Sequence, residues 1–170
     1  MIDLSSHQLG ETDELIEVEF REDLRDLILA MGEQAQHRIL IFSHDLDKSL
    51  YGAQELYEAI KTLAVKSHRT HIQILLHDAG SMTKNGHRLL ELARRISSHI
   101  SIKVTSNEYK DVYETFVVFD DRGYVVQEHH DRYEGSGNFY APGQTRLLSE
   151  QFHEMWERAV VDSTLRRLSL

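Results

Sequence analysis

The sequence predicts a single α/β domain with a mixed, mostly parallel central sheet flanked by helices. Short apolar runs alternate with helical stripes over roughly the first hundred residues, which favours parallel strands joined by helices. A tight hairpin signal follows later and adds antiparallel strands. With 170 residues, of which 41% are hydrophobic and 28% charged, the chain is long enough to bury one core.

The first two β-α units are predicted within residues 15–64. Apolar and polar side chains alternate over residues 15–20, as in a half-buried strand, and residues 24–31 follow with apolar side chains at helical spacing. Residues 38–43 form a continuous apolar run that is typical of a strand covered on both faces. Residues 56–64 then carry the second helical stripe.

The third unit and the hairpin complete the sheet. A strand over residues 72–76 precedes a helix over 89–96 and a strand over 102–104. Two further strands, 115–119 and 124–127, are separated only by a tight turn, so they are predicted to be antiparallel neighbours.

The C-terminal part is predicted to be a loop and a long helix. Gly135-Ser136-Gly137-Asn138 and Pro142-Gly143 mark the loop, and an apolar face at helical spacing runs from Leu148 to Val160. Residues 1–12 are predicted to form a flexible polar lead, which leaves residues 13–170 as one domain.

Composition excludes several classes of function. The chain has no cysteine, so a disulfide framework, a thiolate zinc site and a cysteine nucleophile are excluded. Its formal net charge of −9 repels polyanions, which disfavours nucleic acid as a partner. Its apolar runs are too short to cross a bilayer, so a cytoplasmic protein is expected. No motif predicts a cofactor.

Titratable and aromatic side chains are predicted to gather at one edge of the sheet. Ligands of open α/β sheets bind beyond the carboxyl ends of the parallel strands, and two of these strands end in a His-Asp pair. The hairpin would bring the residues before its first strand and after its second strand to the same edge. The expected group is His44, His77, Tyr113, Glu114, His129 and His130.

Two chemistries suit this group. Neutral imidazoles and carboxylates can hold a metal ion, and histidine can act as acid or base near neutral pH. No regular ligand spacing such as His-Glu-x-x-His supports a metal, so no metal site is assigned. Taken singly, each histidine is better explained as a strand cap, as a partner of loop backbone groups or as part of a polar surface.

Three C-terminal segments carry a resemblance to a known family. Tyr113 to Asp120 lie on a strand, Gly135 to Asn138 follow a returning strand, and Phe152 to Glu157 lie on a helix. This order resembles the end of a phospholipase D superfamily domain, with its His-x-Lys-x4-Asp strand, its Gly-Ser-x-Asn turn and its helix containing Phe and Trp-Glu. The resemblance implies the same fold from about residue 15 and Ser136 and Asn138 as ligand-binding residues.

The departures from the family motif bear on activity. The family uses its histidine as nucleophile or general acid and its lysine to hold phosphate, whereas Tyr113 and Thr115 stand at those places and only Asp120 remains. Threonine supplies no positive charge, and a tyrosine with a pKa of about 10 is a poor nucleophile at neutral pH. The resemblance therefore implies a catalytically inactive domain that acts as a ligand-binding, regulatory or protein-interaction module.

An alternative keeps catalysis with a rearranged site. His129 or His130 would replace the family nucleophile, or His44, His77 and Glu114 would hold a divalent metal, in a phosphodiesterase or nuclease-type hydrolase. The candidate catalytic residues are then His129, His130, Tyr113 and Asp120.

The resemblance also implies partners. Active relatives with one copy of the motif assemble their site from two subunits, which implies a homodimer. The chain is also similar to a bacterial group of phospholipase D-like domains, some of which occur beside acetyltransferase domains, so such a domain is a candidate partner.

Overall fold

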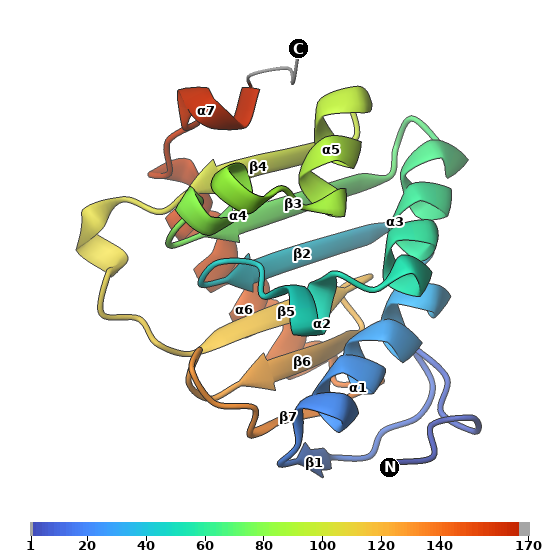
Figure 1. The fold of residues 1–170 in the computed structure, drawn as a ribbon. Coiled ribbons are helices and arrows are strands. Elements are labelled where there is room, and N and C mark those ends of the chain that lie inside the picture. The colour runs from blue at the N-terminus through green and yellow to red at the C-terminus, as the bar shows by residue number, and fades with distance from the viewer. Residues whose placement is uncertain (1, 167–170) are drawn as a thin grey trace.

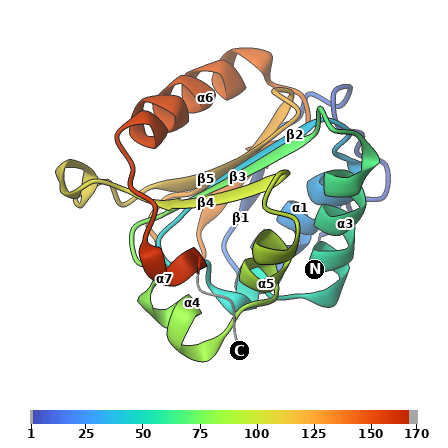
Figure 2. The same ribbon diagram turned by 90° about the horizontal axis from the view of Figure 1, so that it is seen from above.

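The computed structural model describes residues 2–166, which form a seven-stranded sheet between two layers of helices (Figures 1 and 2). The strands lie in the order β1-β7-β6-β5-β2-β3-β4. Their bounds are β1 (Ile16–Val18), β2 (Arg38–Ser43), β3 (His71–Leu76), β4 (Ile100–Val104), β5 (Thr115–Phe119), β6 (Gly123–Gln127) and β7 (Gly135–Asn138). The prediction of a mixed α/β sheet flanked by helices is confirmed.

Helices cover the two faces of the sheet unequally. Figure 2 shows α6 alone on one face and the other labelled helices on the opposite face. The helices are α1 (Arg21–Gln34), α2 (Lys48–Tyr51), α3 (Gln54–Lys66), α4 (Gly80–Asn85), α5 (Arg88–Arg95), α6 (Pro142–Glu157) and α7 (Ser163–Arg166), with a short 3-10 helix at Asn107–Tyr109. Within residues 2–166, none of these helices is both long and apolar enough to span a bilayer.

The strand directions determine which strand ends lie at the same edge. β2, β3 and β4 are parallel, whereas β5 runs antiparallel to β2, and β6, β7 and β1 continue the antiparallel half. The parallel pairing is therefore confined to three strands, so the sheet is mixed but not mostly parallel as predicted, because β1 pairs antiparallel with β7 rather than parallel with β2. The carboxyl ends of β2, β3 and β6 lie at the same edge as the beginnings of β5 and β7.

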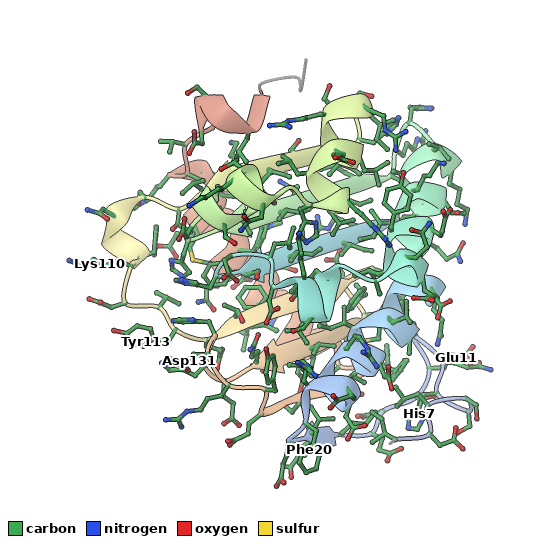
Figure 3. All side chains as sticks on the ribbon, in the orientation of Figure 1. His7, Glu11, Phe20, Lys110, Tyr113 and Asp131 are labelled. Carbon is green, nitrogen blue, oxygen red and sulfur yellow. The ribbon has the colours of Figure 1, made fainter. Side chains whose placement is uncertain are left out.

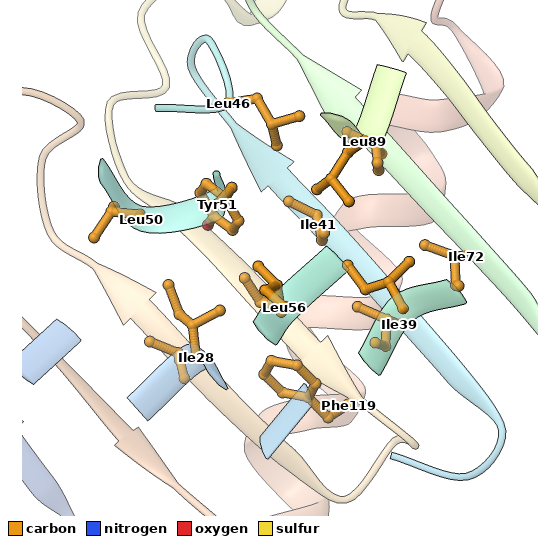
Figure 4. Close-up of a cluster of buried hydrophobic side chains, with 14 of the residues drawn as sticks. Ile28, Ile39, Ile41, Leu46, Leu50, Tyr51, Leu56, Ile72, Leu89 and Phe119 are labelled. Atoms are coloured by element: carbon orange, nitrogen blue, oxygen red, sulfur yellow. The ribbon is translucent and has the colours of Figure 1, made fainter. Parts of the chain in front are cut away.

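Two cores hold the layers together. The larger core packs β-strand side chains such as Ile39, Ile41 and Phe119 against the helices of the crowded face (Figure 4). The smaller core packs α6 onto the other face through Phe152, which is fully buried. Burial of apolar surface is the main stabilising term in both.

The long C-terminal helix ends earlier than its apolar pattern indicates. α6 stops at Glu157, and Val160 instead forms an antiparallel bridge with Val104 at the end of β4. The backbone N–H of each of these two valines donates to the carbonyl oxygen of the other, at 2.8 and 2.9 Å. The last residues of the apolar pattern therefore extend the sheet edge rather than the helix.

The N-terminal segment is hydrogen-bonded to the rest of the domain. Residues 2–12, predicted to be a flexible lead, are hydrogen-bonded to α1 and to the chain after β7: Gln34 Oε1 accepts from Leu9 N at 2.7 Å, and Phe139 O accepts from Gly10 N at 2.8 Å. β1 is shorter than its alternating pattern, because Phe20 begins the turn into α1 and is 65% exposed. The division at residue 12 stays a prediction.

The segment Gly135–Asn138 is a strand, which corrects the prediction of a loop. β7 pairs with β6 on one side and β1 on the other. A Cβ atom added at Gly135 would lie 2.2 Å from the carbonyl oxygen of Val126, so the neighbouring backbone approaches closer than any side chain allows. Glycines stand where a strand usually carries alternating apolar side chains, so the sequence of this strand resembles that of a turn.

We expect Gly135→Ala to lower the free energy of unfolding by about 1–3 kcal/mol, because β6 must shift to admit the new methyl group. Urea unfolding of the two proteins measures the difference. Gly143→Ala is the matched control, since a Cβ atom at Gly143 meets nothing within 4 Å. Equal stability of all three proteins would contradict the close approach of β6 and β7.

Candidate binding site

Four histidines and a tyrosine meet at the edge that collects the strand ends. His44 follows β2, His77 follows β3, His129 and His130 follow β6, and Tyr113 precedes β5. The closest pair of rings is His44 and His130, with centroids 3.9 Å apart and planes 11° apart. The edge predicted from the strand ends is therefore where these side chains lie.

The rings continue outward as one stack. His130 and His129 have centroids 4.8 Å apart, and His129 and Tyr113 have centroids 5.0 Å apart with planes only 19° apart. We call Tyr113, His129, His130 and His44 the ring stack. His77 flanks its inner end, 5.5 Å from His44.

Hydrogen bonds fix the flanking ring, His77. Its Nε2 lies 2.9 Å from the carbonyl oxygen of Val112, which can only accept, so Nε2 carries the proton. Nδ1 is then the acceptor for the hydroxyl of Thr105 at 3.4 Å. Both ring nitrogens of His77 are thus engaged by the protein.

The turn that carries His129 and His130 is held by Gln127. This buried side chain donates through Nε2 to the carbonyl oxygens of His130 and Arg132, at 3.4 and 2.5 Å, and its Oε1 accepts from Thr115 Oγ1 at 3.3 Å. The backbone N–H of His130 also donates to the carbonyl oxygen of Tyr113 at 3.2 Å. Sequence reasoning missed Gln127, because its role depends on the pairing of β5 with β6.

The environment keeps two of the imidazoles neutral. Burial lowers the pKa of His77, and the nearby imidazoles of His44 and His130 lower it further, against the opposing hydrogen bond to Val112. The pKa of His130 is lowered by desolvation and by its ring neighbours, despite Asp131 and Asp45. At neutral pH these two rings are therefore uncharged imidazoles.

The carboxylates near the ring stack differ in their contacts. The carboxylate of Asp131 pairs with His129 Nδ1. Glu114 is exposed, and its pKa is raised by partial desolvation and by the charge of Glu128. Among residues 2–166, no three or more histidine, aspartate or glutamate side chains are placed to hold a metal ion. His44, His77 and Glu114 thus form no ligand set in the described part of the chain.

The two positions that the resemblance assigns to the family histidine and lysine are unlike each other. Tyr113 is 48% exposed and forms the outer end of the ring stack. Thr115 is 2% exposed and is bonded to Gln127 inside the sheet. The described polar contacts at Thr115 thus involve an amide and no cationic group.

Asp120 lies at the opposite end of β5 from the ring stack. Its carboxylate accepts the backbone N–H groups of Gln36, His37 and Arg38, at 2.7, 2.8 and 2.9 Å. Its own N–H donates to the carbonyl oxygen of Arg38 at 2.8 Å. This candidate catalytic residue therefore ties the hairpin turn to the beginning of β2.

Ser136 and Asn138 lie on β7, and their described pairings are with neighbouring strands and with the N-terminal segment. Ser136 pairs with Val126 on β6 and with Glu17 on β1. Asn138 is buried, donates to Asp13 at 2.9 Å, and accepts from the backbone N–H groups of Glu14 and Tyr140. Its described polar contacts hold the N-terminal segment against β7.

A family model described as "Domain of unknown function (DUF7931)" matches residues 20–168. This match covers nearly all of the region that the structure describes, including every strand except β1. A search of curated proteins found no match.

Solved structures share the fold at low sequence identity. TrmBL2, an archaeal chromatin protein with a novel mode of DNA binding, is 14% identical (TM-score 0.64; 94% of this chain and 57% of that chain covered). Nuc from Salmonella typhimurium, a phospholipase D family member, is 13% identical (TM-score 0.56; 79% and 88% covered). Phosphatidylserine synthase from Haemophilus influenzae is 17% identical (TM-score 0.63; 92% and 41% covered).

These likenesses show that the fold is phospholipase D-like, as the sequence predicts. The chain spans less than two thirds of the length of TrmBL2 and of the phosphatidylserine synthase. At these identities the comparisons establish the fold alone, and function has to be argued from the site.

Proposed function

We propose that this chain, which belongs to the DUF7931 family, is a noncatalytic phospholipase D-like module that binds a ligand or a protein partner through the ring stack. The observation that carries the proposal is Thr115, which is buried and bonded to Gln127 at the position of the family's phosphate-holding lysine. A neutral, enclosed hydroxyl cannot stabilise the charge of a transferring phosphoryl group.

The electrostatics of the site support the same proposal. The described ring contacts and ion pairs of the ring stack involve no lysine or arginine. His77 and His130 have lowered pKa values, so they add no positive charge at neutral pH. A phosphodiester brought to this edge would meet the uncharged rings of His77 and His130 and nearby carboxylates, which disfavours its binding.

The proposal predicts that the protein hydrolyses neither bis-p-nitrophenyl phosphate nor single-stranded DNA above the buffer blank, with or without a chelator. Absorbance and gel assays from mildly acidic to neutral pH measure this. The control is the His129→Ala/His130→Ala double variant, which should give the same blank rate. Turnover by the natural chain that disappears in the double variant would overturn the proposal.

One observation favours a hydrolase as the second candidate. The carboxylate of Asp131 pairs with His129, and a carboxylate that orients an imidazole is a recurrent arrangement in nucleophilic and general-base catalysis. The same assay decides between the two, because a His129-based hydrolase loses its turnover in the double variant. A metal-dependent hydrolase would lose it on chelation.

The proposal includes the partners that the resemblance implies. We propose a cytoplasmic homodimer of a single domain over residues 13–170 that associates with a protein such as an acetyltransferase domain. Light scattering of the purified chain tests the dimer. The net charge of −9 supports a protein rather than a nucleic-acid partner, although TrmBL2 is a DNA-binding protein.

A further inference from the structure

The outer end of the ring stack is an aromatic face without a cover among the described residues. His129 stacks on one side of the Tyr113 ring, and Tyr113 remains 48% exposed. We propose that this face binds an arginine side chain of a basic partner protein. This inference rests on the proposed function and specifies the chemistry of its partner.

The rigidity of the Tyr113 ring favours such a role. His129 stacks behind it and is itself stacked on His130, and the Tyr113 hydroxyl donates to Asp111 Oδ1 at 3.4 Å. A ring that is already held in place loses little freedom when a ligand stacks on it. A guanidinium group stacks well on aromatic faces because it is planar and weakly hydrated.

The charged side chains around the Tyr113 ring favour a cationic ligand. Segments 110–114 and 128–134, which flank the ring, contain five carboxylates against two basic side chains: Asp111, Glu114, Glu128, Asp131 and Glu134 against Lys110 and Arg132. Figure 3 shows Tyr113 and Asp131 at the same edge of the molecule. Asp111 is bonded to the Tyr113 hydroxyl and Asp131 to His129, so both carboxylates are tied to the ring stack.

Arginine fits this arrangement better than lysine does. The planar guanidinium can stack on the Tyr113 ring. Its N–H groups, which lie in the plane of the guanidinium, then point outward toward neighbouring carboxylates. An ammonium group is more strongly hydrated and has no planar face. The net charge of −9 also attracts a basic protein over a longer range and repels nucleic acid.

The test is fluorescence anisotropy with a labelled peptide of alternating arginine and glycine, compared with its lysine counterpart at low and physiological salt. We expect the arginine peptide to bind at least about twofold more tightly than the lysine peptide. Tyr113→Leu keeps an apolar side chain but removes the aromatic face. This variant should weaken binding of the arginine peptide by about two- to fivefold.

Asp131→Asn should weaken binding of the same arginine peptide by about twofold. Glu33→Gln, on the exposed side of α1, makes the same change of charge far from the ring stack and should leave binding unchanged. Equal binding of both peptides, or equal losses in Asp131→Asn and Glu33→Gln, would indicate only attraction by net charge and would overturn the arginine site.

The outcome separates this inference from the proposed function. No binding combined with no phosphodiester turnover overturns the arginine site and leaves the noncatalytic module in place. Turnover that depends on His129 and His130 overturns the proposed function, whether or not the peptides bind. Because Tyr113 is half exposed, its replacement should fold, and circular dichroism of each variant verifies this. Asp131→Asn tests the acidic part of the site while the Tyr113 side chain stays present.

Discussion

Asp120→Ala is expected to lower the free energy of unfolding by about 2–4 kcal/mol, because three backbone N–H groups at the beginning of β2 lose one charged acceptor. The loss falls short of three full hydrogen bonds, since water can reach Gln36 and His37. Urea unfolding at neutral pH measures the change in midpoint.

Asp121→Ala is a closely matched control. Asp120 and Asp121 share a left-handed backbone, with φ of 55° and 56°, so alanine brings the same backbone strain at both positions. The Asp121 carboxylate pairs with Arg38 Nη2 at 2.6 Å, but this ion pair is exposed and should contribute less than about 1 kcal/mol. If the two variants lose the same stability, the bonds from Asp120 to the backbone are not what stabilises this turn.

Acidification is expected to destabilise the fold by about 3 kcal/mol through His87 alone. His87 is 5% exposed, donates through Nε2 to the carbonyl oxygen of Leu46 at 3.0 Å, and accepts at Nδ1 from Leu89 N at 3.1 Å. A second proton on the ring would break the bond from Leu89. Desolvation is the main cause that lowers the pKa of His87 to about 4, and the charges of Lys48 and Arg88 lower it further.

The direction of the pH effect follows from this lowered pKa. Between the ordinary histidine pKa of about 6.5 and the folded value, the unfolded chain binds the proton and the folded chain does not. Stability is therefore complete above about pH 6.5 and is lost as the pH falls toward about 4. The lowered pKa values of His77 and His130 act in the same direction.

A variant that cannot titrate isolates the contribution of His87. Asparagine at this position can still accept the N–H of Leu89 as a helix cap, so His87→Asn should unfold with a smaller dependence on pH between about 6.5 and 4. Thermal unfolding across this range measures the dependence. His68→Asn, at an exposed loop position, serves as the control and should keep the full dependence. An unchanged slope in His87→Asn would show that other groups control acid stability.

Sequence reasoning predicted the sheet edge because the direction of a strand determines where its ends lie. The runs before His44 and His77 are continuous and apolar, as the buried strands β2 and β3 require. The hairpin signal gave the reversal between β5 and β6, which brings Tyr113 and His130 to the same edge. The local sequence pattern was therefore sufficient to predict which side chains meet at this edge.

Other features depend on contacts between residues distant in the sequence. Nothing in the order Gly-Ser-Gly-Asn distinguishes a turn from β7, because glycine lacks the side chains that produce a strand pattern. Asp120 was a catalytic candidate through a motif, but its structural role depends on its bonds to the backbone N–H groups of residues 36–38, which lie 82 to 84 positions earlier in the sequence. The early end of α6 depends on the bridge between Val104 and Val160, which no helical period indicates.

The pairing of β1 with β7 makes the order of synthesis important for folding. Ile16 pairs with Gly137, so β1, the first strand of this sheet along the chain, has no partner until β7 has been made. The ladders between β2, β3 and β4 join strands that follow one another closely, so they can close earlier and over shorter loops. The pairings of β7 with β1 and β6 are therefore the last of the strand ladders that the nascent chain can complete, and a ribosome stalled before β7 would leave both β1 and β6 as open edges available for wrong pairing.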